Sequence, residues 1–267
     1  MTDTPQYKYI YGPVSSWRLG KSLGIDPISS IEKTCTFDCV YCQAGKTEVF
    51  RAEREVFVPT KAVLEELESL PPVSVDYITF AGNGEPTLAK NLGDMIRGVR
   101  TIRPEKIAVI TNASLINRQD VQSDLLLADL IEAKLDACSE RGLGKVSRPM
   151  SEILWDEIVT GLKGFRKIFA KHLTLQIMFV AGNQADAEGI ARLACEIGPD
   201  EIEINTPLRV CAVEPLRPEE IAGITETFRR ICGTKSRIRS VYEEKREKSR
   251  PFCQRSTEKR RGKENFG

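Results

Sequence analysis

The middle of the chain alternates between short apolar segments and longer amphipathic ones, and this alternation limits the fold more than any other sequence feature. Residues 75–81 (VDYITFA), 107–111 (IAVIT) and 173–180 (LTLQIMFV) have the continuous apolar pattern of buried strands. Segments with apolar residues at helical spacing lie between them. Because parallel strands need long return connections, strands that alternate with helices predict an α/β fold with a parallel sheet.

The pattern predicts six strands and the helices that connect them. The expected strands are 23–31, 75–81, 107–111, 131–135, 173–180 and 201–205. The expected helices are 59–67, with Thr60 as its N-cap, and then 91–102, 120–128, 153–170, 185–197 and 219–231. A chain of 267 residues has the usual length of a single α/β barrel domain.

The overall composition is that of a water-soluble globular protein. The chain is 41% hydrophobic and 29% charged, with a net charge of +1, so no whole-chain basic excess points to nucleic acid. The longest apolar runs, such as 125–127 and 177–180, are too short to span a membrane, and the polar start at 1–8 lacks a signal-peptide core. We therefore expect a cytoplasmic location and no membrane partner.

The two ends differ in character from the predicted barrel at 23–234. Residues 1–22 are aromatic and extended and are expected to form a cover on the barrel. Residues 235–267 contain twelve Lys or Arg and five Glu, so this basic tail is about +7 and the rest of the chain about −6. The tail either binds the phosphate backbone of an RNA or is a solvated, disordered terminus.

Three cysteines lie within eight residues, on the loop expected after the first strand. Cys35, Cys39 and Cys42 have the spacing C-x3-C-x2-C. A loop of this length can wrap an iron–sulfur cluster, because thiolates are the soft ligands that such clusters need. Three sulfurs bind three irons and leave the fourth open for a substrate or cofactor. The alternatives are a zinc site completed by a distant cysteine and a ferredoxin-like electron-transfer module.

The other five cysteines are scattered, and none of them repeats a C-x2-C pair. The absence of an export signal favours reduced thiols over disulfides. Cys211 and Cys253 could contribute to an auxiliary metal site, although isolated buried cysteines are commoner. The single histidine, His172, is expected at the start of the fifth strand, away from the cysteine loop, and is interpreted as structural.

Polar residues follow several of the predicted strands, where the loops of a parallel barrel form the functional face. The second strand runs into the turn Gly82-Asn83-Gly84-Glu85, in which glycines allow close approach of a ligand to the backbone; the alternative is a tight structural turn. Asn112 follows the third strand and could bind a ligand or cap a helix. Lys134 and Asp136 at the end of the fourth strand form either a structural pair or a ligand-binding pair.

With this cysteine spacing, Tyr41 directly before the last cysteine and the Gly-Asn-Gly-Glu-Pro turn after the second strand, the chain resembles radical S-adenosylmethionine (radical SAM) enzymes over roughly 25–209. The resemblance implies a partial (β/α)6 barrel of the TIM type. It also implies that Cys35, Cys39 and Cys42 hold a [4Fe-4S] cluster whose open iron is chelated by S-adenosylmethionine.

The same resemblance implies roles for residues around the cluster. The turn Gly82-Asn83-Gly84-Glu85 would receive the ammonium group of S-adenosylmethionine, and Tyr41 would lie near its adenine. We expect Asn112, Lys134 and Asp136 to complete the cofactor contacts, and no catalytic residue beyond the cluster is assigned.

The implied reaction is reductive cleavage of S-adenosylmethionine to a 5′-deoxyadenosyl radical, which abstracts hydrogen from a substrate. A one-electron reductant of the flavodoxin or ferredoxin type is the expected partner. Residues 11–24 and 35–43 resemble the group named for the wyosine-forming tRNA enzyme, although no cysteine for a second cluster precedes Cys35. A tRNA or other RNA base is therefore the favoured substrate; a protein, a peptide or a small molecule is the alternative.

Overall fold

The computed structural model of the protein describes residues 7–244 and 249–261. Its centre is an eight-stranded sheet in the order β1-β2-β5-β6-β7-β8-β9-β10. β1 is antiparallel to β2, and every other neighbouring pair in this sheet is parallel. The strands are β1 Ile10–Ser16, β2 Gly20–Ile25, β5 Tyr77–Phe80, β6 Lys106–Thr111, β7 Leu130–Lys134, β8 His172–Met178, β9 Glu201–Asn205 and β10 Arg237–Ser240.

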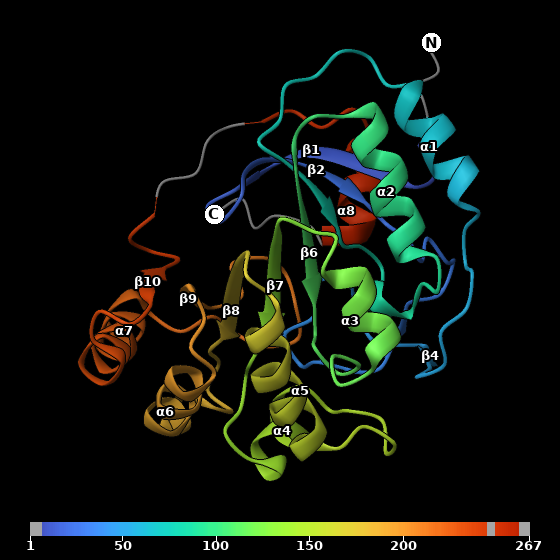
Figure 1. Cartoon of the computed structure of the whole chain (residues 1–267). Helices are drawn as coiled ribbons and strands as arrows, with labels where there is room; N and C mark the ends of the chain where they lie inside the picture. Colours follow the sequence, from blue (N-terminus) through green and yellow to red (C-terminus); the bar gives the residue numbers. More distant parts are fainter. Residues whose placement is uncertain (1–6, 245–248, 262–267) are drawn as a thin grey trace.

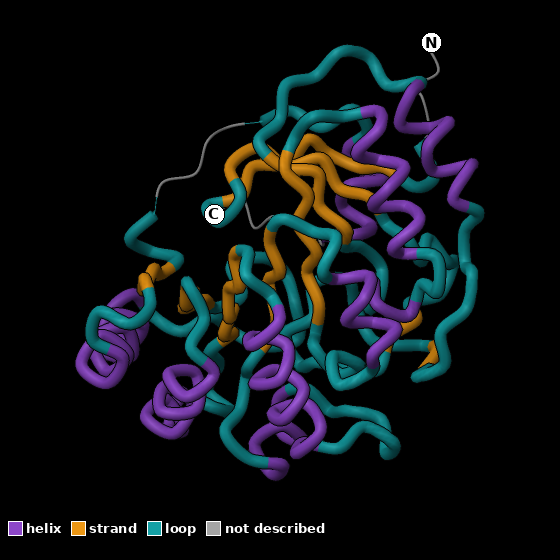
Figure 2. Tube along the Cα trace, in the orientation of Figure 1, coloured by secondary structure: helices purple, strands orange, loops and turns teal. Residues whose placement is uncertain are grey.

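Most of the helices form an outer layer around the curled sheet, which makes a partial barrel (Figure 1). The helices are α1 Thr60–Glu68, α2 Leu92–Ile102, α3 Gln119–Leu125, α4 Glu140–Val146, α5 Trp155–Ile168, α6 Ala187–Ile197, α7 Pro218–Cys232 and α8 Gln254–Arg261. Two short strands, β3 Thr34–Cys35 and β4 Val49–Phe50, pair separately from the main sheet. The strands converge at the centre while helices lie outside them (Figure 2).

The two faces of the sheet have different chemistry because side chains alternate along each strand. The face that packs on the helices is apolar, and Ile78, Phe80 and Val109 are fully buried there. The concave face carries polar groups, including Ser22 and Thr79, whose hydroxyl oxygens lie 2.6 Å apart. A concave face of this kind suits a hydrated or ligand-filled cavity better than a packed core.

The six predicted strands correspond to β2 and β5–β9, but the first one lies earlier than predicted. β2 ends at Ile25, whereas the sequence predicted a strand over 23–31. The reason is that the side chain of Asp26 accepts hydrogen bonds from the amides of Ile28 and Ser29, which turns the chain directly after the strand. Thr60 is the first residue of α1 and Pro59 is the N-cap, so that N-cap prediction was wrong.

Both ends of the chain contribute to the main fold. The described part of the predicted cover forms β1 and the start of β2, which pair with each other in the sheet. Within the predicted tail, β10 pairs with β9 and α8 packs against β1 (Figure 1). The described parts of 235–267 are therefore structured, and residues 245–248 and 262–267 of that predicted tail lie outside the described residues.

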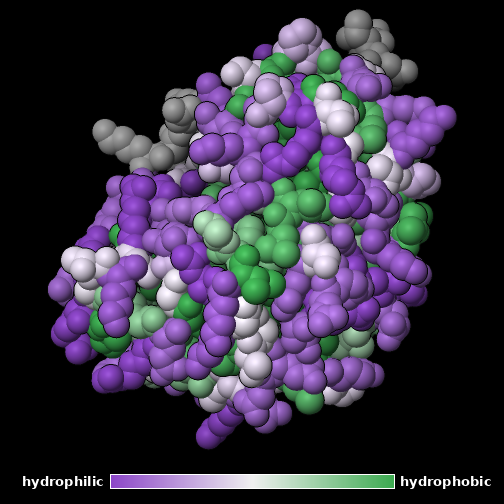
Figure 3. All heavy atoms as spheres, viewed as in Figure 1, coloured by the Kyte–Doolittle hydropathy of each residue, from purple (hydrophilic) through white to green (hydrophobic). Residues whose placement is uncertain are grey.

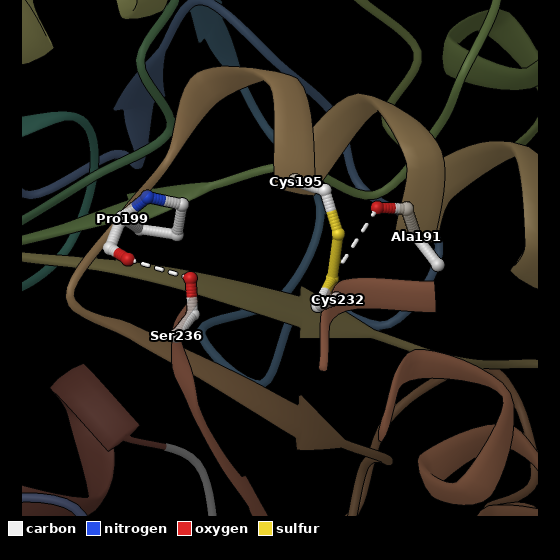
Figure 4. Close-up of a disulfide and its surroundings, with 5 residues drawn as sticks. All are labelled: Ala191, Cys195, Pro199, Cys232 and Ser236. Atoms are coloured by element: carbon white, nitrogen blue, oxygen red, sulfur yellow. Dashed lines mark hydrogen bonds between the residues drawn. A yellow bond between two sulfur atoms is a disulfide. The ribbon is translucent and has the colours of Figure 1, made fainter. Parts of the chain in front are cut away.

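A disulfide joins the ends of two neighbouring helices. Cys195 of α6 and Cys232 of α7 are bonded, with their Cα atoms 5.5 Å apart (Figure 4). This corrects the expectation that all the cysteines are reduced thiols. α6 and α7 pack side by side and so bring together two cysteines that are 37 positions apart in the sequence.

The surface is mostly hydrophilic on the face shown in Figure 3, with a hydrophobic strip near its centre. None of the helices in the described parts of the chain combines the length and the apolar character needed to cross a bilayer.

Candidate active site

The cysteine loop is held in place by the end of α4 and the residues that follow it. The amide of Asp38 donates to the carbonyl of Arg148 (3.1 Å), and the amide of Val40 donates to the carbonyl of Val146 (2.9 Å). Backbone hydrogen bonds of this kind restrict the loop without using any of its thiols. The three cysteines of the loop are consequently free to act as ligands.

Burial favours the protonated form of the Cys35 and Cys39 thiols. Burial and the nearby Glu85 raise the pKa of Cys35 to about 12, and burial also raises the pKa of Cys39. Burial opposes the charge of Lys33, but the neighbouring Cys42 and Cys35 raise its pKa overall. A buried cation beside the loop is suited to balance the negative charge of bound thiolates.

The loop supplies three thiols, which are the donors of an iron–sulfur cluster. No group of three or more His, Cys, Asp or Glu side chains within 7–244 and 249–261 is arranged to hold one metal ion. Three free thiols on one short loop fit a [4Fe-4S] cluster, in which each sulfur binds a different iron.

The glycine turn after β5 lies directly against the start of the cysteine loop. The amide of Glu85 donates to the carbonyl of Thr34 (3.3 Å), and a Cβ added to Gly84 would overlap that same oxygen. Only glycine allows this approach. The turn and the metal-binding loop are therefore one connected unit.

The carboxylate of Glu85 acts as an internal brace. It accepts hydrogen bonds from the amide and hydroxyl of Thr87 (3.1 and 2.7 Å), the hydroxyl of Thr111 (2.6 Å) and the amide of Asn112 (2.7 Å). Burial raises its pKa, although these hydrogen bonds oppose the rise. Glu85 thus ties the turn after β5 to the end of β6.

Asn112 faces the cysteine loop. Its side-chain nitrogen donates to the hydroxyl of Thr36 (2.7 Å) and to the sulfur of Cys35 (3.6 Å). The amide group is therefore in position to interact with a metal-bound thiolate.

Tyr41, Lys134 and Asp136 form one buried group. The hydroxyl of Tyr41 donates to Asp136, which also accepts the amide of Met178 (2.6 Å) and pairs with Lys134 (3.1 Å). The ammonium of Lys134 lies 4.8 Å from the centre of the Tyr41 ring, and burial lowers its pKa. Lys134 and Asp136 therefore form the predicted pair, and Asp136 holds the hydroxyl of Tyr41.

A cavity of about 280 Å³ opens beside this group on the concave side of the sheet. Of the predicted site residues, Tyr41, Cys42, Gly82 and Lys134 line it. Five others do not belong to its lining, namely Asn83, Gly84, Glu85, Asn112 and Asp136. Its charged lining is mainly cationic and consists of Arg18, Lys134, Arg209, Arg260 and Arg261. Glu132 is the one carboxylate that the described residues contribute to the wall.

Several of these cavity residues were missed by the sequence reasoning. Arg18 pairs with Glu132, Arg209 binds Gln43 (2.9 Å), and Arg260 comes from the predicted tail. The polar start of β2 and the basic residues after β9 were the available sequence signals. Neither of these two sequence signals could indicate which side chains face the cavity.

A second cavity, of about 510 Å³, lies at the amino-terminal ends of the strands. Arg18 and Leu19, from the turn between β1 and β2, line both cavities together with Glu132 of β7. Glu203 lines this second cavity. One carboxylate oxygen of Glu203 has no hydrogen-bond partner among the described residues. His172 is also here, at the end of the barrel away from the cysteine loop.

The two cysteines considered for an auxiliary site have local partners. The thiol of Cys211 donates to the carbonyl of Val213 (3.1 Å), and the sulfur of Cys253 accepts the amide of Ser256 (3.4 Å). Neither belongs to a metal-binding group of three or more side chains within the described residues.

Known proteins share both the sequence and the fold. The sequence model of the Radical SAM superfamily matches residues 30–194. A UPF0026 protein of Synechocystis is 42% identical over 75% of this chain and 76% of its own length. A UPF0026 protein of Methanocaldococcus jannaschii is 36% identical over 84% of this chain and 72% of its own length.

Among solved structures, Streptococcus suis SuiB bound to S-adenosylmethionine is similar with a TM-score of 0.59. The match covers 81% of this chain and 46% of that protein at 14% identity, which is a likeness of fold. The relatives named above carry the UPF0026 name and not that of the wyosine-forming group. Family membership makes a [4Fe-4S] cluster and S-adenosylmethionine the cofactors of this protein. The chain belongs to the radical SAM superfamily.

Proposed function

We propose that this protein cleaves S-adenosylmethionine reductively and removes a hydrogen atom from an anionic substrate, for which an RNA base is the favoured candidate. The observation that carries the proposal is the cavity whose lining contains Cys42, Tyr41 and Gly82 together with several cationic side chains. When bound, the cluster and S-adenosylmethionine supply a 5′-deoxyadenosyl radical.

In this proposal the residues bind, orient and shield the cofactors. Cys35, Cys39 and Cys42 hold three irons, and the turn at 82–85 receives the amino-acid end of S-adenosylmethionine. The ring of Tyr41 is fixed by Asp136 and offers a flat surface for an adenine. The concave wall excludes water from the reacting groups. A flavodoxin- or ferredoxin-type reductant would deliver the electron.

The charge of the cavity supports an anionic substrate. Arg18, Lys134 and Arg260 are each paired with a carboxylate, and Arg209 and Arg261 add two further cations to the lining. A wall of this kind would favour phosphate or carboxylate groups of a ligand. The resemblance of 11–24 and 35–43 to the wyosine-forming group further supports an RNA base. The exposed cation Lys259 lies on α8, the helix that also contributes Arg260 and Arg261 to the cavity lining, and could contact RNA phosphates.

The test of the reaction is anaerobic reconstitution with iron and sulfide, followed by reduction in the presence of S-adenosylmethionine. We expect 5′-deoxyadenosine to form, and Cys39→Ala to abolish both the cluster and the product. A fully formed cluster that cleaves no S-adenosylmethionine would contradict the enzyme and favour the electron-transfer alternative.

The substrate is identified by supplying separate RNA, protein and metabolite fractions from cells grown in deuterated medium. Deuterium should enter 5′-deoxyadenosine from the RNA fraction. Deuterium from the protein or metabolite fraction would overturn the RNA assignment and support one of the other two substrate classes.

A further inference from the structure

The turn after β5 rests on one buried carboxylate. Asp26 directly follows β2 and is 1% exposed. One of its oxygens accepts the amides of Ile28 (3.2 Å) and Ser29 (3.0 Å), and the other accepts the amide of Asn83 (3.2 Å). A single carboxylate thus connects the end of the first barrel strand to the turn at 82–85.

Gly82 packs directly on this carboxylate. A Cβ at position 82 would overlap the side chain of Asp26. Only glycine therefore allows the backbone of the turn to approach Asp26 this closely. Gly82 also lines the cavity that contains Cys42. The position of Asp26 therefore determines where the cavity-facing backbone of the turn lies.

The positive charge that balances Asp26 comes from α8. The Nε of Arg260 donates to Asp26 Oδ2 at 2.9 Å, and the Arg260 side chain is only 5% exposed. Its other nitrogens donate to the carbonyl of Lys8, to the hydroxyl of Ser29 (3.2 Å) and to the backbone and side chain of Ser256 (3.2 and 2.8 Å). Each of the three guanidinium nitrogens of Arg260 therefore donates at least one hydrogen bond.

The segment around α8 is attached to β1, which orients Arg260. The amide of Gly12 donates to the hydroxyl of Thr257 (3.1 Å), and the amide of Phe252 donates to the carbonyl of Gly12 (2.7 Å). Arg261 donates to the carbonyl of Ser15 (3.2 Å). The segment covers β1, the edge strand of the sheet, and places the guanidinium of Arg260 beside Asp26.

We propose that α8 is a required part of the S-adenosylmethionine site and that Arg260 is a positioning residue for the turn at 82–84. Arg260 holds Asp26, and Asp26 holds the backbone of Gly82 and Asn83 in the form that binds the amino-acid end of the cofactor. The identity of that ligand rests on the proposed function. Removing the guanidinium leaves a buried carboxylate without its cation, and the turn must move to hydrate it.

The test compares Arg260→Gln with Arg255→Gln, which changes an exposed arginine of the same helix. The dissociation constant for S-adenosylmethionine is measured by equilibrium dialysis on the reconstituted proteins. Amide hydrogen exchange of 82–84 is measured on the proteins without cofactors. Arg260→Gln should weaken binding about 10- to 100-fold and speed exchange of the Asn83 amide, whereas Arg255→Gln should change neither.

Two further variants separate positioning from general destabilisation. Arg260→Lys keeps the charge without the planar fork and should recover part of the affinity. Asp26→Asn combined with Arg260→Gln should lose little more affinity than either single change, because both act on one contact.

The proposal is overturned if Arg260→Gln binds S-adenosylmethionine as the wild type does at temperatures where it is folded, even if its melting temperature falls. Unchanged exchange of the Asn83 amide would equally overturn it. A wild-type protein that binds no S-adenosylmethionine would contradict the proposed function instead, and the exchange data alone would then decide whether Arg260 holds the turn.

Discussion

The carbonyl oxygen of Thr34 lies against the Cα of Gly84 so closely that no side chain fits between them. Gly84 also has a φ of +152°, a conformation that side-chain-bearing residues rarely adopt. This contact joins the start of the cysteine loop to the turn that follows β5. The metal ligands and the predicted cofactor-binding turn therefore cannot shift independently.

Gly84→Ala is expected to destabilise the fold and to impair cluster loading. Forcing a methyl group against the Thr34 carbonyl should lower the free energy of unfolding by about 1–3 kcal/mol. Urea denaturation of the cofactor-free protein and iron content after reconstitution measure the two effects. The control is Gly144→Ala in α4, where an added Cβ meets no atom within 4 Å. That change should be neutral or stabilising by roughly 0.5–1 kcal/mol. Equal stability of the two variants would refute the packing argument.

Replacing cysteines one at a time should separate cluster ligands from other thiols. Cys39→Ala should reduce the iron content from about four atoms per chain to near zero, because two cysteines cannot retain the cluster. Cys211→Ala should leave the iron content unchanged, since its thiol donates to a backbone carbonyl. Iron and sulfide analysis after anaerobic reconstitution measures both, and loss of iron in Cys211→Ala would point to a second metal site.

Asn112→Ala should lower the reduction potential of the cluster. The Asn112 amide donates to the sulfur of Cys35, and such donors stabilise the more negative, reduced cluster. We expect a decrease on the order of tens of millivolts, measured by redox titration without S-adenosylmethionine. Asn117→Ala, which removes a surface hydrogen bond to Glu157, is the control. An unchanged potential in Asn112→Ala would show that this amide does not tune the cluster.

The pH dependence of stability should depend on Glu203. Burial raises its pKa to about 8 from an ordinary 4.5; the nearby Glu201 adds to the rise, and Arg18 and Arg239 oppose it. The folded protein thus keeps a proton that the unfolded chain releases, so the free energy of unfolding should fall as pH rises from 4.5 to 8 and then level off.

Glu203→Gln mimics the protonated side chain and should remove most of this pH dependence. At about pH 9 the variant should be more stable than the wild type by on the order of 1–3 kcal/mol, while at about pH 5 the two should be similar. Thermal unfolding across the pH range measures the difference. Parallel stability curves for the two proteins would mean that Glu203 ionises normally.

The barrel strands were predictable because they are buried on both faces. The runs at 75–81 and 173–180 are mostly apolar, and their isolated polar residues do not interrupt the pattern of a buried strand. β1 was not identified as a sheet strand because Gly12-Pro13 interrupts it and its pairing with β2 shifts register between Tyr11 and Val14. α8 was interpreted as part of a basic tail because its partners, β1 and Asp26, lie more than 200 positions earlier in the sequence.

The spacing C-x3-C-x2-C predicts Cys35, Cys39 and Cys42 as cluster ligands from local sequence alone, and the structure leaves all three thiols free. The hydrogen bonds of Glu85 could not be predicted in this way. Its donors Thr111 and Asn112 come from the end of the next strand, β6, which lies far from Glu85 in the sequence. The Lys134–Asp136 pair was anticipated as one of two alternatives from strand alternation. The Cys195–Cys232 disulfide depends on how two helices pack, which no local pattern encodes.

Asp26 and Arg260 are 234 positions apart, which has a consequence for the order of events during protein synthesis. The ribosome delivers Asp26, the cysteine loop and Gly82 long before it reaches position 260. Until α8 has left the exit tunnel and packed on β1, the carboxylate beneath the turn has no guanidinium beside it. The proposed role of Arg260 therefore implies that the cofactor site matures late, after translation has passed α8.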